Sequence, residues 1–512
     1  MDPKPDAEAI AVTLSPYGFQ DAQRACARLL DLSTERIPFL STRRCRHFLA
    51  AIANPLLSAI ADTPNPDQTL ENLCHVSDSL GGKGVLWELF NFHPASLRLY
   101  VRLCASSWYL SRILTKQPGM IDELLDSLLV DRLPSMESLE HTLAELCQGA
   151  SDIEPMLHSF KDGYHLRVGV RDLLRKESVK DTHRALSDIA EVCLGQITER
   201  QYYRLTERHG EPTVLGKSNE GQICELVVLA MGKLGGQEPN FHSDLDLVFL
   251  YEADGQSIHR GRLRRDKTTN QRFFSLLGQR IIKAVTQRGP YGRLYELNTR
   301  LRLTGSQGAL AVSFADFSQY FGSGKATIAE RQAICKARPI YGSTQARSAA
   351  ANLVRQTILE AAWQPAHAEE IRQHRQRLEA SADQQNLKRS PGGTMDIEFV
   401  VQMLQLRYAS EFPHVLAPGT LDALEKLREA NLLDAQDASY FDESYRFLRR
   451  VESGLRLMDA SARHDLPKKQ FDLYCLADLL GVESPVELKQ QFDFYTHENR
   501  LRFNRLFDDT RG

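Results

Sequence analysis

The spacing of apolar residues along the chain changes twice. From Ala22 to about Arg208 apolar residues recur three and four positions apart, as they do between Leu97 and Ile113, and this spacing is typical of amphipathic helices. A cluster of Gly, Ser, Asn and Lys at 216–221 ends the pattern, and short continuous apolar runs typical of buried strands follow it. After Ser343 the helical spacing returns. The pattern predicts a compact α/β unit inserted in a helical chain.

The expected fold class is mainly α, with an inserted α/β core that contains a mixed β-sheet and is flanked by helical domains. The domains predicted from the pattern are 1–215, 216–345 and 346–512. In the core we expect strands at 226–231, 244–251, 293–303 and 309–313, and helices at 267–286, 314–321 and 327–337. In the C-terminal domain we expect a helix at 395–408 and further helices from about 421, 440 and 485, together forming a bundle.

Composition narrows the class of protein. With 42% hydrophobic and 25% charged residues the chain is typical of a globular protein, and its formal net charge of -3 gives no basic field for nucleic acid or an anionic membrane. The nine cysteines form no C-x-x-C pair, and no apolar window is long enough to span a bilayer. We therefore expect a soluble, cytoplasmic protein. The charged runs Glu369–Arg377 and Arg449–Arg450 are interpreted as solvated helix faces.

The most informative segment is Leu226–Tyr251, which reads LVVLAMGKLGGQEPNFHSDLDLVFLY. Its first strand ends in a glycine-rich turn, where few side chains cover the backbone amides. Such a turn can bring N–H groups against phosphate oxygens, and a lysine beside it can add a positive charge. The residues expected to contact phosphate are Gly232, Lys233, Gly235 and Gly236.

Two aspartates open the next strand. Residues two apart on a strand share a face, so Asp244 and Asp246 present their carboxylates side by side, whereas Leu245, Leu247 and Phe249 point into a core. Adjacent carboxylates repel unless a cation lies between them, and Mg²⁺ prefers oxygen ligands from one or two carboxylates together with phosphates. A bare D-x-D is more often a solvent-facing strand end. The glycine turn upstream favours the metal interpretation here.

These motifs resemble the nucleotidyltransferase superfamily signature, and more narrowly the glutamine synthetase adenylyltransferase family. Three further segments carry the resemblance, in the family's order and spacing. They are LYELNTRLRLTGSQGAL at 294–310, ERQAICKARPIYG at 330–342 and LKRSPGGTMDIEFVVQ at 387–402.

The resemblance implies Mg²⁺-dependent transfer of AMP from ATP, as substrate, to a tyrosine of glutamine synthetase. It implies a metal site at Asp244, Asp246 and Asn298, where the family usually has a third carboxylate in place of Asn298. Glu296 lies two residues away and is a possible substitute, and Leu303 replaces a usual proline. The other nucleotide contacts that it implies are Ser243, Arg300 and Arg302.

The resemblance leaves several alternatives open. Family members are usually longer, with one half that attaches AMP and one that removes it by phosphorolysis, and the D-I-E-F motif is more like the attaching half. A catalytically weak member that binds glutamine synthetase or a PII-like signalling protein is a second possibility. A nucleic-acid nucleotidyltransferase shares the core motif but is disfavoured by the net charge.

A few other residues have two interpretations each. Lys336 and Arg338 either approach the nucleotide or end a solvated helix. Thr394 fits a helix N-cap, and the acidic residues after it, Asp396 and Glu398, are either structural or part of the site. His242 could act as an acid or base beside the site, but a histidine in such a position is more often an ordinary loop residue.

Overall fold

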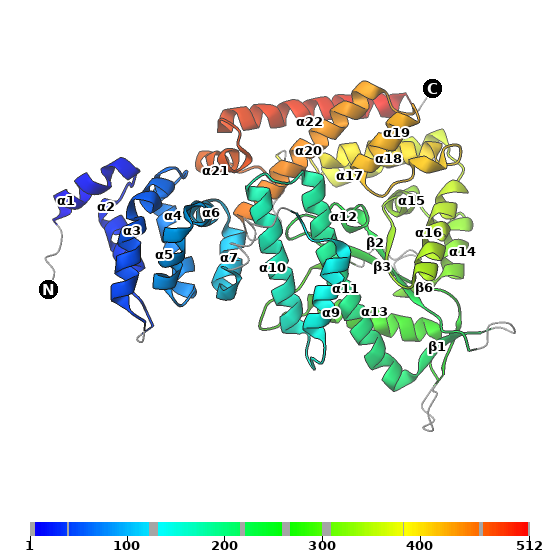
Figure 1. The fold of residues 1–512 in the computed structure, drawn as a ribbon. Helices are drawn as coiled ribbons and strands as arrows, with labels where there is room; N and C mark the ends of the chain where they lie inside the picture. The colour runs from blue at the N-terminus through cyan, green and yellow to red at the C-terminus, as the bar shows by residue number, and fades with distance from the viewer. Residues whose placement is uncertain are drawn as a thin grey trace.

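The computed structural model describes residues 6–37, 40–121, 132–215, 221–258, 267–298, 309–381, 383, 385–459 and 464–509. Within these ranges the chain is mostly helical and contains a small mixed β-sheet, so the predicted fold class is confirmed. The N-terminal helices lie at one side of the molecule, the sheet lies at the other, and the C-terminal helices run across the top (Figure 1). No described helix has the length and apolar character needed to cross a membrane.

Helices form nearly all of the described chain before the first strand, as the apolar spacing predicts. The longest, α11, begins where the Ser178 side chain accepts a hydrogen bond from the Asp181 amide and ends at Gly210. The helices of this region are α1 (Ala7–Leu14), η1 (Ser15–Tyr17), α2 (Ala22–Leu32), α3 (Thr42–Ala61), α4 (Pro66–Ser79), α5 (Lys83–Phe92), α6 (Pro94–Ser106), α7 (Trp108–Lys116), η2 (Pro118–Met120), α9 (Met136–Cys147), α10 (Glu154–Leu173) and α11 (Val179–His209).

The central sheet has the strand order β5-β3-β2-β7, and β6 also pairs with β3. β2 runs antiparallel to β3 and β7, whereas β3 runs parallel to β5 and β6, so the sheet is mixed as expected. A separate antiparallel pair joins β1 and β4. The strands are β1 (Glu211–Val214), β2 (Leu226–Met231), β3 (Leu245–Tyr251), β4 (Gly255–Ile258), β5 (Leu297–Asn298), β6 (Ala311–Ser313) and β7 (Arg338–Tyr341).

The strand predictions agree with the structure to different degrees. The strand expected at 226–231 is confirmed, and the strand expected from 244 begins at Leu245. Of the strand expected at 293–303, Leu297–Asn298 is present and residues from 299 on lie outside the described residues. β1, β4 and β7 escaped prediction because they are short and carry polar residues or proline. β1 pairs with β4 across the expected boundary at 215, so it packs with the core; the domain division itself stays a prediction.

The helices after β4 largely follow the predicted pattern. The helix expected at 327–337 is shorter, because the chain turns into β7 at Arg338. Thr394 is not an N-cap: the cap position belongs to Gly393 and the helix begins at Thr394. The helices are α12 (Gly232–Gly235), α13 (Asn270–Thr286), α14 (Phe314–Gly322), α15 (Ile328–Ile334), α16 (Thr344–Leu359), α17 (Pro365–Glu379), α18 (Thr394–Tyr408), η3 (Pro413–Val415), α19 (Thr420–Glu429), α20 (Ala435–Met458), α21 (Gln470–Leu480) and α22 (Pro485–Asp508).

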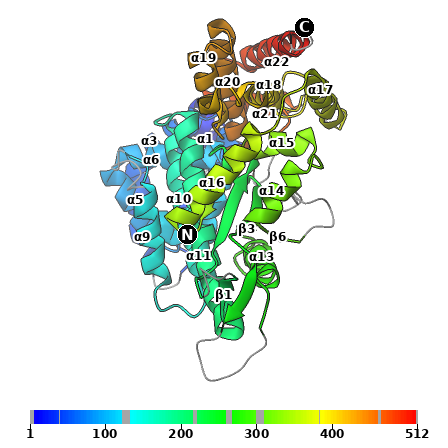
Figure 2. The same ribbon diagram turned by 90° about the vertical axis from the view of Figure 1, so that its right-hand side faces the viewer.

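The two faces of the sheet belong to different hydrophobic cores. Leu245, Leu247 and Phe249 pack with the N-terminal helices and α13, which confirms that these three residues face a core. Val248 and Leu250 point the other way and pack with α16 and the C-terminal helices. Figure 2 shows α13 and α16 beside the strands. Because side chains alternate along a strand, Asp246 shares the face of Val248, on the side of the C-terminal helices.

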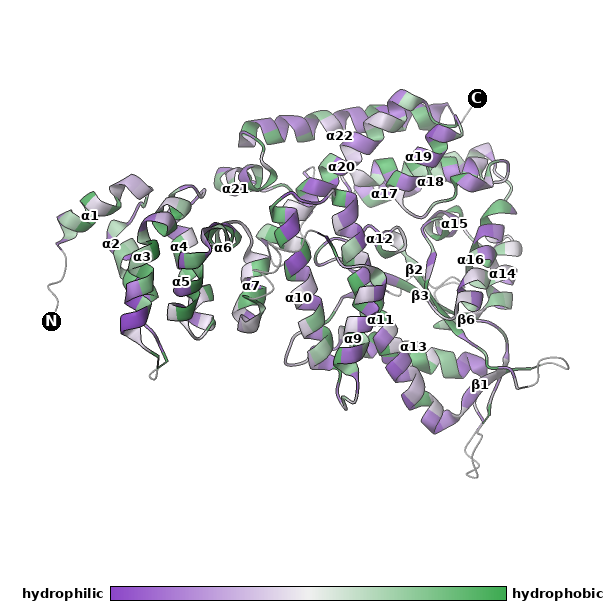
Figure 3. Cartoon of the chain, in the orientation of Figure 1, coloured by the Kyte–Doolittle hydropathy of each residue, from purple (hydrophilic) through white to green (hydrophobic). Residues whose placement is uncertain are grey.

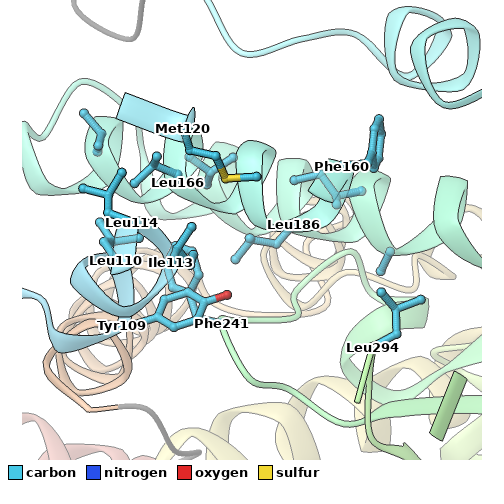
Figure 4. Packing of buried hydrophobic residues seen from close by; sticks show 14 of the residues in the cluster. Tyr109, Leu110, Ile113, Leu114, Met120, Phe160, Leu166, Leu186, Phe241 and Leu294 are labelled. Carbon is cyan, nitrogen blue, oxygen red and sulfur yellow. The ribbon is translucent and has the colours of Figure 1, made fainter. Parts of the chain in front are cut away.

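The core on the N-terminal side extends up to the loop that precedes β3. Figure 4 shows Tyr109 and Phe241 close together, with Leu110, Ile113 and other apolar side chains gathered around α10. The rings of Tyr109 and Phe241 have centroids 5.6 Å apart. This packing holds the loop directly before the two aspartates. Elsewhere apolar and polar residues are mixed along the helices, as amphipathic helices require (Figure 3).

The interpretation of the two charged runs as solvated faces is wrong for one arginine in each. Arg375 is fully buried, and its Nε donates to Asp396 Oδ1 at 2.6 Å while its Nη2 donates to the carbonyls of Arg389 and Ser390. Arg449 is also buried and pairs with Glu452. A buried arginine is tolerated only when it is paired and hydrogen-bonded, and sequence spacing alone does not reveal the partners.

Replacing Arg375 by Met is expected to lower the free energy of unfolding by about 3–5 kcal/mol, because it leaves the buried Asp396 carboxylate without its main partner. The matched control is Arg372→Met on the same helix, where the partner Asp508 is 57% exposed and the expected loss is below about 1 kcal/mol. Urea unfolding of the two variants measures the difference. Equal losses in both variants would contradict the structural role of Arg375.

Candidate functional site

The two predicted metal ligands lie at the beginning of β3. Asp246 is in the strand, opposite Met231 of β2 on one side and Asn298 of β5 on the other. Asp244 directly precedes the strand and is exposed, whereas Asp246 is half-buried. The structure therefore brings together all three residues proposed for the metal site.

The electrostatics of Asp246 suit a cation. Burial raises the pKa of its carboxyl to about 6, and repulsion from Asp244 adds to the rise. The positive charge of Lys388 and a hydrogen bond from the Asn298 side chain act in the opposite direction without cancelling it. The carboxylate pair is thus only partly neutralised by its protein neighbours.

The donor set also fits the ion that the sequence predicts. Among the described residues no cluster of three or more His, Cys, Asp or Glu side chains is arranged to hold a metal. Two carboxylates and an amide oxygen, from Asp244, Asp246 and Asn298, are nevertheless enough for Mg²⁺, which usually keeps several waters and also binds substrate phosphates. These residues therefore suit an open Mg²⁺ site, in which water and phosphate complete the coordination, and not a site closed by protein ligands alone.

Gly232 allows the chain to turn directly against this carboxylate. It follows β2 with φ +54, a conformation that L side chains rarely adopt, and a Cβ at this position would lie 2.5 Å from Asp246 Oδ2. Any other residue would displace the carboxylate. The glycine-rich segment is one helical turn, α12, rather than an open loop.

The other two glycines of the turn serve packing. A Cβ on Gly235 would lie 1.8 Å from the Lys336 carbonyl oxygen, and one on Gly236 would lie 2.9 Å from the Pro418 carbonyl oxygen. The Gly236 amide already donates to the Gly232 carbonyl at 3.1 Å. Close backbone approach explains both glycines, and their predicted contact with phosphate stays a prediction.

Lys233 is committed to a buried ion-pair network. Its Nζ donates to Glu398 Oε1 at 2.5 Å and to the Tyr445 hydroxyl at 2.9 Å, and it lies 3.8 Å from Glu238 Oε2. Burial lowers the pKa of Lys233 to about 8, since the nearby Glu398 offsets only part of the cost of desolvation. The side chain links the glycine turn to the C-terminal helices, and its predicted contact with phosphate also remains untested.

Lys336 completes this network. Its Nζ donates to Glu238 Oε2 at 2.8 Å and lies 3.5 Å from Glu398 Oε2. Burial alone would raise the pKa of Glu398, but Lys233 and Lys336 together lower it to about 2. Glu398 is therefore an ion-pair residue, and Lys336 is not at a solvated helix end. Arg338 is in β7 and pairs with Glu191, its Nη1 lying 2.9 Å from Oε2.

The loop before Asp244 is held by internal hydrogen bonds. Ser243 Oγ accepts from the Asn240 amide at 2.8 Å and from Arg456 Nη1 at 3.1 Å, so the hydroxyl stabilises the turn. His242 has φ +58 and packs edge-on against Tyr109, with ring centroids 4.2 Å apart. Its pKa is lowered to about 3, chiefly by burial. A neutral, buried imidazole is a weak base at pH 7, which favours the interpretation as a loop histidine.

The family model described as Glutamate-ammonia ligase adenylyltransferase matches residues 97–353, about half of the chain. The chain belongs to this family. A second model, described as GlnD PII-uridylyltransferase, matches residues 364–510. The two matches together cover the sheet, the carboxylate pair and the C-terminal helices.

Curated relatives in this adenylyltransferase family are similar over most of the chain. The bifunctional glutamine synthetase adenylyltransferase/adenylyl-removing enzyme of Thioalkalivibrio sulfidiphilus is 32% identical over 89% of this chain and 48% of its own length. The enzyme of the same name from Nitrosococcus oceani is 30% identical over 89% of this chain and 48% of its own length. The chain spans about half the length of the curated relatives it matches.

Two residues near the carboxylate pair have a role that only the structure shows. Lys388, the lysine of the segment LKRSPGGTMDIEFVVQ, lies close enough for its charge to act on both Asp246 and Glu398. Arg456 of α20 fixes the loop before Asp244, and no sequence pattern distinguished it from other arginines. The position of Lys388 in a family motif was a sequence signal that could have identified it. Arg300 and Arg302, predicted to bind triphosphate, lie outside the described residues.

Replacing Glu398 by Gln is expected to lower the free energy of unfolding by about 3–5 kcal/mol at pH 6, because the buried Lys233 and Lys336 are then left with a single shared carboxylate, that of Glu238. The folded-state pKa of Glu398 is about 2, below the unfolded value of about 4.3. The stabilising contribution of the carboxylate is therefore complete above about pH 4.3 and disappears as pH falls toward 2.

Urea unfolding of both proteins at pH 6 and pH 3 measures this effect, and the difference between them should shrink at pH 3. The matched control is Glu425→Gln, whose carboxylate is 60% exposed in its pair with Arg428; its loss should stay below about 1 kcal/mol. A loss in Glu398→Gln that does not change between the two pH values would refute the assignment.

Proposed function

We propose that this chain transfers AMP from ATP to a tyrosine of glutamine synthetase, as a cytoplasmic, Mg²⁺-dependent nucleotidyltransferase. Family membership supports the reaction class, and the names of the relatives support the protein substrate. The observation that carries the proposal is the meeting of Asp244, Asp246 and Asn298 beside the Gly232 turn.

In this proposal Asp244, Asp246 and the Asn298 amide oxygen hold Mg²⁺, which supplies charge neutralisation at the phosphates. The tyrosine oxygen attacks the α-phosphorus, the bond from that phosphorus to the bridging oxygen breaks, and pyrophosphate leaves with the bonding electrons. The chain itself contributes mainly positioning and preorganised charge. The rigid pairing of β3 with β2 and β5 fits this role, since it fixes the carboxylates before substrate arrives.

A second candidate reaction is removal of AMP from glutamine synthetase, which the bifunctional names of the relatives favour. Inorganic phosphate would attack the phosphorus of the AMP–tyrosine ester, releasing ADP and the free tyrosine. The same carboxylates would serve both directions.

A third candidate is a weakly catalytic binding protein for glutamine synthetase or a PII-like protein. Asn298 favours it, because an amide brings no negative charge to the metal site. The similarity of residues 364–510 to a PII-uridylyltransferase model is the feature that motivates a PII-like partner.

Asp246→Asn and Asp244→Asn are each expected to reduce AMP incorporation into glutamine synthetase at least about 100-fold, because each removes a negative charge from the metal site. Incorporation is measured with α-labelled ATP and Mg²⁺. The control Asp493→Asn changes an exposed carboxylate on α22 and should keep full activity. Normal incorporation by either of the first two variants, in protein with an unchanged circular dichroism spectrum, would refute the metal assignment.

Asn298→Asp is expected to lower, about tenfold or more, the Mg²⁺ concentration needed for half-maximal ATP binding, since a third carboxylate strengthens a hard-cation site. Calorimetric titration of ATP at several Mg²⁺ concentrations measures the shift, with the exposed Asn504→Asp of α22 as the charge-matched control. If the native chain is a weakly catalytic binding protein, Asn298→Asp should also gain AMP transfer. An unchanged Mg²⁺ dependence would mean that Asn298 is not a metal ligand.

A further inference from the structure

A cavity of about 440 Å³ opens against Asp244 on the side of α10 and α11. Its walls come from four segments: α10 with Lys161, α11 with Ala190, the loop that leads into β3, and the stretch from Arg293 to Glu296. Neither the glycine turn nor Asp246 lines the cavity. The cavity therefore reaches Asp244 from a different side than the glycine turn that is proposed to bind the phosphates.

Four polar atoms of cavity-lining residues are buried without a hydrogen-bond partner in the described part of the chain. They are His165 Nε2, His242 Nε2, Arg293 Nε and the Tyr295 hydroxyl. His165 is 3% exposed and Tyr295 is 9% exposed. Buried polar groups are nearly always hydrogen-bonded, and leaving one unsatisfied is costly. These atoms gather in the walls of one cavity, beneath the surfaces that face it.

The cavity walls suit a flat ring that carries a hydroxyl group. Tyr295 and His242 provide aromatic surface. Lys161 Nζ lies 4.5 Å from the Tyr295 ring centroid and donates to the Leu294 carbonyl at 2.6 Å. An ammonium has three donors, so Lys161 retains N–H groups that can stabilise an oxygen with developing negative charge.

We propose that this cavity receives the side chain of the acceptor tyrosine, with its ring against Tyr295 and His242 and its hydroxyl directed toward Asp244. The assignment rests on the proposed function and deepens it. In-line displacement requires the attacking and leaving oxygens on opposite sides of the phosphorus, and the cavity and the glycine turn approach the carboxylates from different sides. The cavity also exceeds the volume of one phenol ring, which leaves room for the adjoining peptide.

The chemical step then balances without another reactant. The phenol oxygen forms the new bond to the α-phosphorus while the bond to the bridging oxygen breaks, and pyrophosphate carries away that electron pair. The phenol proton passes to water at the mouth of the cavity.

The test measures binding of N-acetyl-tyrosinamide to the whole chain by saturation-transfer NMR, with Mg²⁺ and a non-hydrolysable ATP analogue present. The blocking variant is Ala190→Phe, which places a larger side chain at a cavity-lining position of α11. The control is Ala144→Phe, at an exposed position of α9 that lines a different cavity. A second variant, His242→Asn, removes the ring and keeps a residue type that tolerates φ +58.

The wild type and Ala144→Phe are expected to bind the tyrosinamide, and to bind it better than N-acetyl-phenylalaninamide, which lacks the hydroxyl. Ala190→Phe and His242→Asn should weaken tyrosinamide binding at least fivefold and change the affinity for the ATP analogue less than twofold. Absence of tyrosinamide binding in the wild type overturns the assignment. Loss of the nucleotide rather than the tyrosinamide in Ala190→Phe also overturns it, because the cavity would then hold ATP.

This binding assay does not depend on AMP transfer, so the two proposals can fail separately. If the wild type labels no glutamine synthetase yet binds tyrosinamide in the expected pattern, the proposed function fails and the cavity assignment stands. In active protein, Ala190→Phe should raise the KM for glutamine synthetase at least tenfold while the KM for ATP stays within twofold. An unchanged KM for glutamine synthetase counts against the cavity.

Discussion

The antiparallel pairing of β2 with β3 determines where the candidate site residues lie. It sets Asp246 opposite Met231, so that the chain leaving β2 turns at Gly232 directly beside the carboxylate. Parallel pairing with β5 then brings Asn298 to the other side. The register matters because a slip of one residue would move Asp246 to the opposite face and into the N-terminal core. Strand pairing and one glycine thus position the residues of the proposed metal site.

The buried ion-pair network fixes the C-terminal helices relative to this site. Lys233 comes from the glycine turn, Lys336 from the segment before β7, and Glu398 from α18. The three side chains meet where they are largely shielded from solvent. Charges buried in this way cost free energy unless each has partners, so removing Glu398 leaves the two ammonium groups with Glu238 as their one shared carboxylate. The arrangement couples the position of the C-terminal helices to the turn that borders Asp246. These motif residues therefore help to hold the C-terminal helices against the glycine turn.

Much of the fold was predictable from the sequence because apolar spacing reports which face of a helix or strand is buried. That spacing gave β2 within its observed bounds and the alternation of Leu245, Leu247 and Phe249 into a core. It could not reveal β1, β4 or β7, since their short polar strands depend on partners distant in sequence. For the same reason it misjudged Arg375, whose buried partners come from α18 and the loop before it. Arg449 pairs with Glu452 of its own helix and also donates to the carbonyl of Glu238, which is distant in sequence.

The candidate site, too, could be predicted only in part from the sequence. Asp244 and Asp246 could be found from their spacing together with the glycine turn upstream, because period-two alternation makes two carboxylates neighbours. The roles of Lys233, Gly235 and Ser243 could not, since a lysine or a glycine beside a turn fits both phosphate binding and packing. Lys388 and Arg456 reach the site from the C-terminal part of the chain, and only the tertiary structure identifies their effects on Asp246 and on the loop before Asp244.

The most direct test of the central claim is incubation of the purified chain with glutamine synthetase, Mg²⁺ and α-labelled ATP, followed by mapping of the labelled residue by mass spectrometry. We expect a single AMP group on a tyrosine, dependent on Mg²⁺ and lost in Asp246→Asn. Labelling that persists in Asp246→Asn, or an active chain that needs no divalent cation, would contradict it.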